Sequence, residues 1–116
     1  MSSREDVIQF LKEFIFKMDF WGLYVRINRP KNNDTLYALE LSANDVKGVL
    51  KKLELEDYSE GPVLDTLYRK SELWVFGKVI KEHEVYIKIQ LGEPGCNTIC
   101  ISFHFAEYTM KYPFKK

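Results

Sequence analysis

The sequence has few of the features that mark a secreted, membrane or metal-binding protein. Its 116 residues include only two cysteines and two histidines, and its 17 basic residues are balanced by 17 acidic ones. A balanced charge excludes the global basic field that draws many nucleic-acid binders to their targets, so an anionic partner has to be held by a local patch. No secretory leader and no apolar run of bilayer-spanning length is recognisable, so we expect a cytoplasmic protein with reduced thiols.

The cysteines and histidines do not form a recognisable metal pattern. Cys96 and Cys100 are spaced C-x-x-x-C across a turn and the start of a strand, and His83 and His104 do not complete a zinc-ligand set with them. We therefore expect no metal and no cofactor. Hydrophobic residues are plentiful, at 46% of the chain, and can form a single core. No linker segment is recognisable, so the sequence predicts one domain over residues 1–116.

Two stretches have the period of amphipathic helices. The first is capped by Ser2 or Ser3, ends at Gly22 and has apolar residues every three or four positions. The second follows Ser42 and Asp45, which resemble a capping box, and is expected to reach about residue 55.

The segments around the second helix predict a hairpin and a loop. Residues 23–28 and 35–41 alternate in the manner of strands on either side of a polar turn, so we expect a hairpin. Residues 53–72 are acidic and irregular, which predicts a long loop that is either functional or a solvated connection. After Phe105 we expect an extended tail that lies along the domain, since Pro113 excludes a central strand.

The stretch from residue 73 to residue 105 organises the rest of the chain, because it reads as three consecutive antiparallel strands. Alternation gives each strand an apolar face and a second, more polar face. The apolar face is expected to carry Leu73, Val75, Gly77, Val79, Val85, Ile87, Ile89, Leu91, Ile99, Ile101, Phe103 and Phe105. The second face is expected to carry Trp74, Phe76, Lys78, Tyr86, Lys88, Gln90, Cys100, Ser102 and His104.

Pairing apolar residues with one another across the strands gives a register. A turn centred on Glu82 puts Lys78 opposite Tyr86, and the longer Gly/Pro turn puts Tyr86 opposite His104. These three residues then form one row, with Lys88 and Ser102 in the row beside it. Directly opposed side chains are close enough for their functional groups to converge.

Such a row suits phosphodiester cleavage without a metal. A histidine such as His104 can transfer protons, a lysine can offset charge in the transition state, and Tyr86 can donate a hydrogen bond or stack on a base. The row lacks a base for a ribose 2′-hydroxyl, which Glu60, Asp57 or Glu107 can supply if the loop or the tail folds over it. The alternative is an ordinary exposed sheet face, where a lone histidine is more often inert than catalytic.

Four short motifs resemble those of a known protein family. The segments EDYSEGP (56–62), LWVFGK (73–78), EVYIKI (84–89) and CISFH (100–104) resemble, in order and spacing, the C-terminal half of the MqsR-type toxins. These proteins are the motility quorum-sensing regulator family of bacterial mRNA interferases. The resemblance covers about half of the chain, and the N-terminal half has no clear counterpart.

This resemblance implies a RelE-like α+β fold, in which a curved antiparallel sheet has two helices packed on one face. It also implies a metal-independent endoribonuclease. The family's strand tyrosine matches Tyr86, and its C-terminal lysine falls at His104. Its other lysine falls at Glu60 and its glutamine at Val75, so two of four site positions depart from the family. A histidine and a glutamate are the acid and base of related RelE-like ribonucleases, which implies a rearranged His104–Glu60 pair.

We therefore expect the toxin of a type II toxin–antitoxin system, with an mRNA substrate and a cognate antitoxin that is a zinc-binding or helix-turn-helix protein. The expected catalytic residues are His104, Tyr86, Lys88, Lys78 and Glu60, and the expected RNA contacts are Trp74, Arg26 and Lys111. The alternative is a non-catalytic module that docks a protein partner through Trp74, Phe76, Tyr86 and the aromatic tail. The neutral net charge favours the alternative, and the convergent lysines and His104 favour the nuclease.

Overall fold

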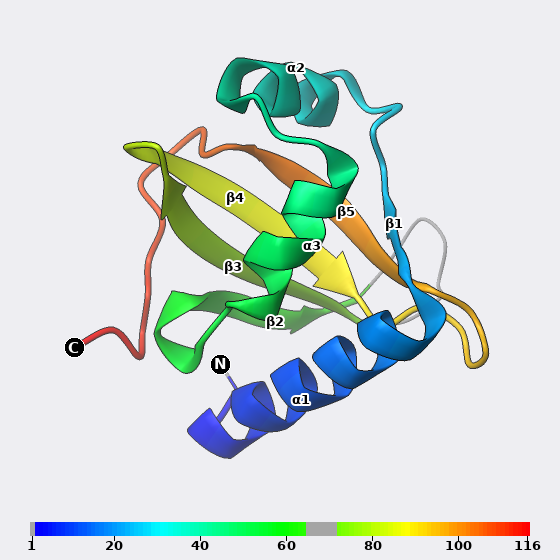
Figure 1. Cartoon of the computed structure of the whole chain (residues 1–116). Coiled ribbons are helices and arrows are strands. Elements are labelled where there is room, and N and C mark those ends of the chain that lie inside the picture. The colour runs from blue at the N-terminus through cyan, green and yellow to red at the C-terminus, as the bar shows by residue number, and fades with distance from the viewer. Residues whose placement is uncertain (1, 65–71) are drawn as a thin grey trace.

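A computed structural model describes residues 2–64 and 72–116, which form three α helices and a five-stranded sheet (Figure 1). Helices α1 (Arg4–Trp21) and α3 (Ala43–Lys51) cover one face of the sheet, and α2 (Pro30–Leu39) lies at one edge. The predicted α+β class is confirmed, but three helices are present where two were expected. No helix in the described part of the chain is long and apolar enough to cross a membrane.

The ends of α1 and α3 are set by the capping residues that the sequence indicated. Ser3 and Asp6 form a reciprocal capping box at the start of α1, and Ser42 and Asp45 form the same arrangement at the start of α3. Such caps satisfy backbone N–H groups that have no partner within the helix. Gly22 ends α1 with a positive φ of 89°, which glycine adopts without steric cost.

The predicted hairpin over residues 23–41 is wrong. Only β1 (Leu23–Val25) is a strand, and the second half of the segment is helix α2. Pro30 occupies the first turn of α2, where its missing N–H costs nothing and its fixed φ favours the helix. Two of the four buried residues of α2, Asn32 and Thr35, are polar. The apolar residues of this segment therefore do not recur at the spacing of a helix, and the sequence predicted a strand instead.

The sheet has the order β1-β5-β4-β3-β2, and only the β1–β5 pair is parallel. The remaining strands are β2 (Tyr58–Val63), β3 (Leu73–Ile80), β4 (His83–Gln90) and β5 (Thr98–Phe105). The three predicted strands are therefore confirmed as β3, β4 and β5. The sheet is mixed rather than wholly antiparallel, because β1 pairs in parallel with β5.

The acidic segment over residues 53–72 is only partly a loop. It contains a short 3₁₀ turn (Leu55–Asp57) and then strand β2, which adds an edge to the sheet beside β3. Residues 65–71 lie outside the described part of the chain. The loop prediction fails here because β2 carries Gly61 and Pro62, residues that are depleted in strands except at edges and irregularities.

The register between β3 and β4 differs by one residue from the prediction. The hairpin turn contains only Lys81 and Glu82, both with positive φ, so Tyr86 pairs with Gly77 and not with Lys78. A slip of one residue moves a whole strand to the opposite face. The predicted row of Lys78, Tyr86 and His104 is therefore wrong, although the pairing of Tyr86 with His104 is confirmed.

The same change of register buries the aromatic residues of β3. Trp74 stacks on Phe10 of α1 with 4.4 Å between ring centroids, and Phe76 is fully buried beside them. Burying a side chain of this size stabilises the fold by roughly 1.5–3 kcal/mol. Trp74 and Phe76 thus hold α1 on the sheet and do not face a ligand.

The alternation of β5 is broken at Ile101. Lys88 pairs with Ser102 while Ile89 pairs with Cys100, so Ile101 has no partner in β4. Such a bulge bends the strand and changes the face of the residues beyond it. Cys100 therefore turns into the core, where it is fully buried, rather than lying beside Ser102 as predicted.

Helix α2 covers the part of β5 that extends beyond β1. The Asn32 side chain donates to the carbonyls of Arg26 and Ile101 and accepts from the Phe103 N–H, at 2.9–3.0 Å. Thr35 Oγ1 accepts from the Phe105 N–H at 3.1 Å. Side chains of α2 thus make the hydrogen bonds to β5 that a neighbouring strand would otherwise make. The same bonds hold α2 at this edge of the sheet.

The C-terminal tail (residues 106–116) lies along the domain, as expected. It runs from the end of β5 past the β3–β4 hairpin towards the start of β2 (Figure 1). Met110 is buried, the Tyr112 hydroxyl donates to the Glu84 carboxylate at 2.7 Å, and the Phe114 ring packs on Tyr58. Three separate contacts therefore hold the tail against the sheet.

Candidate functional site

The face of the sheet turned away from α1 and α3, here the polar face, carries two adjacent rows of side chains. One row runs across four strands through Glu60, Val75, Lys88 and Ser102, and the next contains Gly77, Tyr86 and His104. Adjacent strands lie about 4.8 Å apart, so neighbouring residues within each row lie within reach of one another.

His104 is held in one orientation. Its imidazole stacks on the Tyr86 ring with 5.1 Å between centroids and 14° between planes, and its exposed fraction is only 8%. Its Nδ1 lies 3.0 Å from the Phe105 carbonyl oxygen. A carbonyl oxygen can only accept, so Nδ1 carries the proton in this contact. The Nε2 atom is then the nitrogen available for proton transfer.

Tyr86 is a hydrogen-bond donor rather than a base. Burial raises the pKa of its phenol to about 12, helped by the nearby Tyr108 and Glu60 and opposed by Arg29. The phenol therefore keeps its proton at neutral pH. Along the sheet, Glu60 lies on β2, two strands from Tyr86, and Arg29 bonds Ser102 of β5 on the other side of β4.

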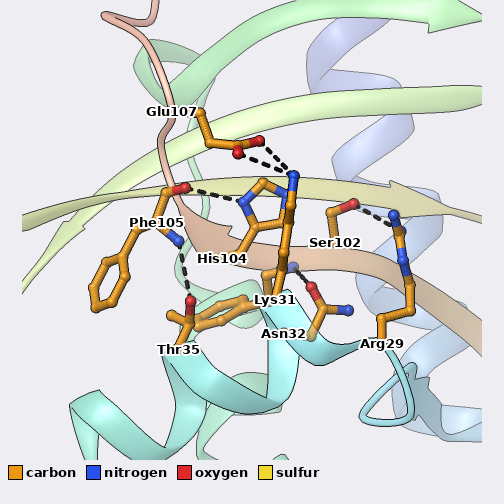
Figure 2. Close-up of polar contacts among 9 residues, drawn as sticks. Arg29, Lys31, Asn32, Thr35, Ser102, His104, Phe105 and Glu107 are labelled. Carbon is orange, nitrogen blue, oxygen red and sulfur yellow. Dashed lines mark hydrogen bonds and ion pairs between the residues drawn. The ribbon is translucent and has the colours of Figure 1, made fainter.

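Two cations flank the Tyr86–His104 pair. Lys88 Nζ lies 5.7 Å from the centroid of the Tyr86 ring, and Arg29 Nη1 donates to the Ile101 carbonyl and to Ser102 Oγ at 2.9 and 3.2 Å. Figure 2 shows Arg29 reaching Ser102 from the N-terminal end of α2. An anion bound on this surface would be attracted both by the Lys88 ammonium of β4 and by the Arg29 guanidinium at the start of α2.

A second carboxylate lies beside His104. Lys31 of α2 pairs with Glu107 of the tail at 2.9 Å, and both side chains border a hollow lined by His104 (Figure 2). The hydrogen bond and charge of Lys31, and to a lesser extent His104, lower the pKa of Glu107. Glu107 is therefore ionised at neutral pH and already has a cationic partner.

Four of the five predicted catalytic residues lie on one face of the sheet, and three of them, Tyr86, Lys88 and His104, are in contact or adjacent. Tyr86, Lys88, His104 and Glu60 all lie on the polar face. Lys78 points to the opposite face, where it pairs with Asp57 at 3.0 Å, so neither Lys78 nor Asp57 belongs to the site. The cause is the one-residue change in register described above.

The predicted RNA contacts divide in the same way. Trp74 is 8% exposed and stacked on Phe10, so its proposed contact with RNA is wrong. The partner-docking alternative likewise loses Trp74 and Phe76, which are buried. Arg26 is half-buried beside β5, where its backbone N–H bonds Cys100. Lys111 is exposed on the tail, across a cleft from Glu60.

Sequence reasoning missed Arg29 as a site residue. Its position falls in the polar turn of the hairpin that the sequence predicted over residues 23–41. The available signal was Pro30, which marks a helix start and so places Arg29 at the helix N-terminus rather than in a mobile turn. In the described part of the chain, no three His, Cys, Asp or Glu side chains lie close enough together to hold a metal ion.

Comparison with known proteins gives no matching family model, no matching curated protein and no matching solved structure. The polar face itself carries a histidine, a tyrosine, two cations and a carboxylate, which come from β2, β4, β5 and the start of α2.

Proposed function

We propose that this protein is a metal-independent endoribonuclease that cleaves mRNA on the polar face of its sheet. The observation that carries the proposal is the His104–Tyr86 stack, in which His104 has Nε2 available and stands between cations and carboxylates. This set offers an acid, a base and a counter-charge for a phosphate, which are the groups that RNA cleavage by internal attack requires.

The chemistry assigns one role to each group. Glu60 accepts the proton of a ribose 2′-hydroxyl, and the 2′-oxygen attacks the adjacent phosphorus. The bond from phosphorus to the 5′-oxygen breaks, and the imidazolium form of His104, which carries a proton on both ring nitrogens, donates its Nε2 proton to that oxygen. Lys88 and Arg29 offset the negative charge that builds on the phosphate oxygens. The products are a 2′,3′-cyclic phosphate and a 5′-hydroxyl, so atoms and protons balance.

Tyr86 completes the site without changing its protonation state. Because its phenol stays neutral at pH 7, Tyr86 can donate a hydrogen bond to a phosphate oxygen while its ring holds the imidazole in place. Loss of the ring is expected to affect the orientation of His104 as well as the binding of phosphate.

We further propose that the nuclease is a RelE-like toxin of the MqsR type within a type II toxin–antitoxin system. The resemblance of the four motifs supports this, together with an α+β fold in which α1 and α3 lie on one face of the sheet and the candidate site lies on the other. Glu60 and Val75 depart from the family pattern, so the proposed acid and base are His104 and Glu60 rather than the family's own residues.

The antitoxin has a candidate binding surface on α1. The outward side of this helix exposes Phe16 at 76%, Phe20 at 71% and Trp21 at 49%. Exposed aromatic clusters of this kind mark protein interaction sites. The same surface would serve the alternative, a non-catalytic module, which predicts partner binding without any RNA cleavage.

The nuclease proposal is tested by incubating purified protein with single-stranded RNA in the presence of EDTA. Wild type is expected to give 2′,3′-cyclic phosphate ends, and His104→Ala is expected to lower the rate at least about 100-fold. His83→Ala is the matched control, because His83 is the other histidine and lies exposed at the β3–β4 hairpin. Equal cleavage by wild type and His104→Ala would remove His104 from the mechanism.

The toxin proposal is tested by expression in bacteria. Growth should stop when the wild-type chain is expressed, and co-expression of a small reading frame adjacent to its gene should restore growth. A Phe16→Ser/Phe20→Ser variant should still arrest growth but should no longer be rescued. Rescue of this variant as efficient as that of wild type would move the antitoxin away from α1.

A further inference from the structure

A cleft lies between strand β2 and the C-terminal tail, at the edge of the polar face. It has a volume of about 570 Å³, within the range of pockets that hold small organic ligands. Its lining includes Ser59, Glu60, Pro62, Lys111, Tyr112 and Pro113. Two segments about fifty residues apart in the sequence therefore form its opposite walls.

The walls combine flat apolar surfaces with polar groups of both kinds. Pro62 of β2 and Pro113 of the tail belong to opposite walls, and Tyr112 adds an aromatic residue to the wall formed by the tail. Glu60 offers a carboxylate acceptor, Lys111 an ammonium donor, and a serine hydroxyl can act as either. A ligand that fits has a planar body with donors and acceptors along its edge.

The position of the cleft connects it to the candidate site. Glu60 lines the cleft and also lies in the row of Lys88 and Ser102, close enough to Tyr86 to help raise the pKa of that phenol. Tyr112, which lines the cleft, also packs over Gly77 in the row of Tyr86 and His104. The cleft therefore borders the surface where the scissile phosphate would bind.

We propose that this cleft binds a nucleobase of single-stranded RNA, at a nucleotide flanking the scissile phosphate. The inference rests on the proposed nuclease function and adds the part of the substrate that the cleft recognises. Single-stranded RNA is read by stacking unpaired bases on flat side chains and by hydrogen bonds to their edges, and the cleft supplies both.

The tail has a defined role in this proposal, because it forms one wall of the cleft. The hydrogen bond from Tyr112 to Glu84 and the packing of Phe114 on Tyr58 hold that wall at a set distance from β2. The cleft is therefore formed before RNA arrives, which lowers the entropy cost of binding.

The first test measures binding and does not depend on catalysis. Amide resonances of the ¹⁵N-labelled protein are followed by NMR during titration with each of the four nucleoside 5′-monophosphates and with ribose 5-phosphate. The backbone amides of Ser59, Gly61, Lys111 and Tyr112 are expected to shift with at least one nucleotide and not with ribose 5-phosphate. Absence of these shifts, or equal shifts with ribose 5-phosphate, would overturn the proposal.

The matched variants sharpen this measurement. Lys111→Ala/Pro113→Ala removes a donor and a ring face from the cleft wall and is expected to weaken nucleotide binding about tenfold. Lys52→Ala/Pro94→Ala removes the same residue types from exposed positions outside the cleft and should bind as wild type does. Equal weakening in both variants would show that the cleft is not the binding site.

The second test measures cleavage of RNA with a randomised sequence. Wild type is expected to favour one or two bases at a single position beside the cut, and the cleft variant should lose that preference while it still cuts. Unchanged preference in the variant would overturn the base-binding role and leave the nuclease proposal standing. Nucleotide shifts in the cleft without any RNA cleavage would instead remove the nuclease proposal and keep the cleft as a nucleotide site.

Discussion

Tyr112 occupies the space over Gly77 that a side chain at this position would fill. A Cβ atom built on Gly77 would collide with the Tyr112 hydroxyl oxygen and lie 2.8 Å from two of its ring atoms. Glycine in the middle of a strand weakens the strand unless another group needs to approach the backbone closely. Here the approaching group is the tail, whose Tyr112 also bonds Glu84.

This contact predicts that Gly77→Ala destabilises the protein. The added methyl would force Tyr112 to move, and overpacking of this kind costs about 1–3 kcal/mol of unfolding free energy, measurable by urea denaturation. Gly48→Ala is the control, because nothing lies within 4 Å of its Cβ position and alanine favours a helix interior by roughly 1 kcal/mol.

A double variant checks the cause. In Gly77→Ala/Tyr112→Ala the methyl no longer meets the phenol, so the loss of stability should be clearly smaller than the sum of the two single losses. Additive losses would mean that the methyl on Gly77 disturbs the sheet and not the tail.

Two lysines separated by ten residues should behave differently in an RNA-cleavage assay. Lys88 lies on the polar face above the Tyr86 ring, so Lys88→Ala should lower kcat by about 10²-fold, as for other groups that stabilise transition-state charge. Lys78 lies on the other face and pairs with Asp57, so Lys78→Ala should leave kcat unchanged. The reverse ranking would restore the row predicted from sequence and contradict the β3–β4 register.

Asn32 is expected to be the most sensitive polar residue of α2. It is fully buried and makes three hydrogen bonds to the edge of β5 and to the Arg26 carbonyl. Asn32→Ala leaves those backbone groups without partners and should cost about 3 kcal/mol or more. Thr35→Val removes a single acceptor, for the Phe105 N–H, and should cost about 1–2 kcal/mol.

The urea midpoints of Asn32→Ala and Thr35→Val show whether these α2 side chains provide the hydrogen bonds that the free edge of β5 needs. If Asn32→Ala proves no more harmful than Thr35→Val, water or a shift of α2 satisfies the exposed edge of β5. Asn32→Asp adds a further check, because it keeps the acceptor for Phe103 N–H but loses both donors and should resemble Asn32→Ala.

Local signals explain which parts of the fold were predictable. The serine caps of α1 and α3 and the existence of strands β3, β4 and β5 depend on residues close together in the sequence, and these were predicted. Helix α2 was missed because two of its buried residues, Asn32 and Thr35, are polar and serve β5 rather than a hydrophobic core. Their role is visible only once the strand edge they cover is known.

For the candidate site, the pairing of β4 with β5 was predicted correctly, whereas the register of β3 against β4 was not. The pairings of Tyr86 with His104 and of Lys88 with Ser102 were inferred correctly from the facing rule. The position of Lys78 was not, because the hairpin turn uses Lys81 and Glu82 with positive φ. Two-residue turns of this kind normally carry Asn or Gly, so neither residue indicates the turn.

The buried Cys100 thiol predicts how stability depends on alkaline pH. Burial raises the pKa of this thiol from 9.0 to about 12, so the folded state holds the proton more tightly than the unfolded chain does. Its contribution to stability is therefore complete below pH 9 and is lost as the pH rises from 9 towards 12. The Tyr86 phenol, whose pKa is raised from 10.0 to about 12, adds a loss that begins near pH 10.

Urea unfolding at a series of pH values should accordingly give a constant midpoint from pH 7 to pH 9 and a falling one above it. Cys100→Ala should delay the fall to about pH 10, where tyrosine begins to contribute, while Cys96→Ala should not, because Cys96 is exposed. Thiol labelling gives an independent measurement of the same burial. One equivalent of thiol should react in the native protein and a second only after unfolding, and rapid reaction of both would mean that β5 does not turn Cys100 into the core.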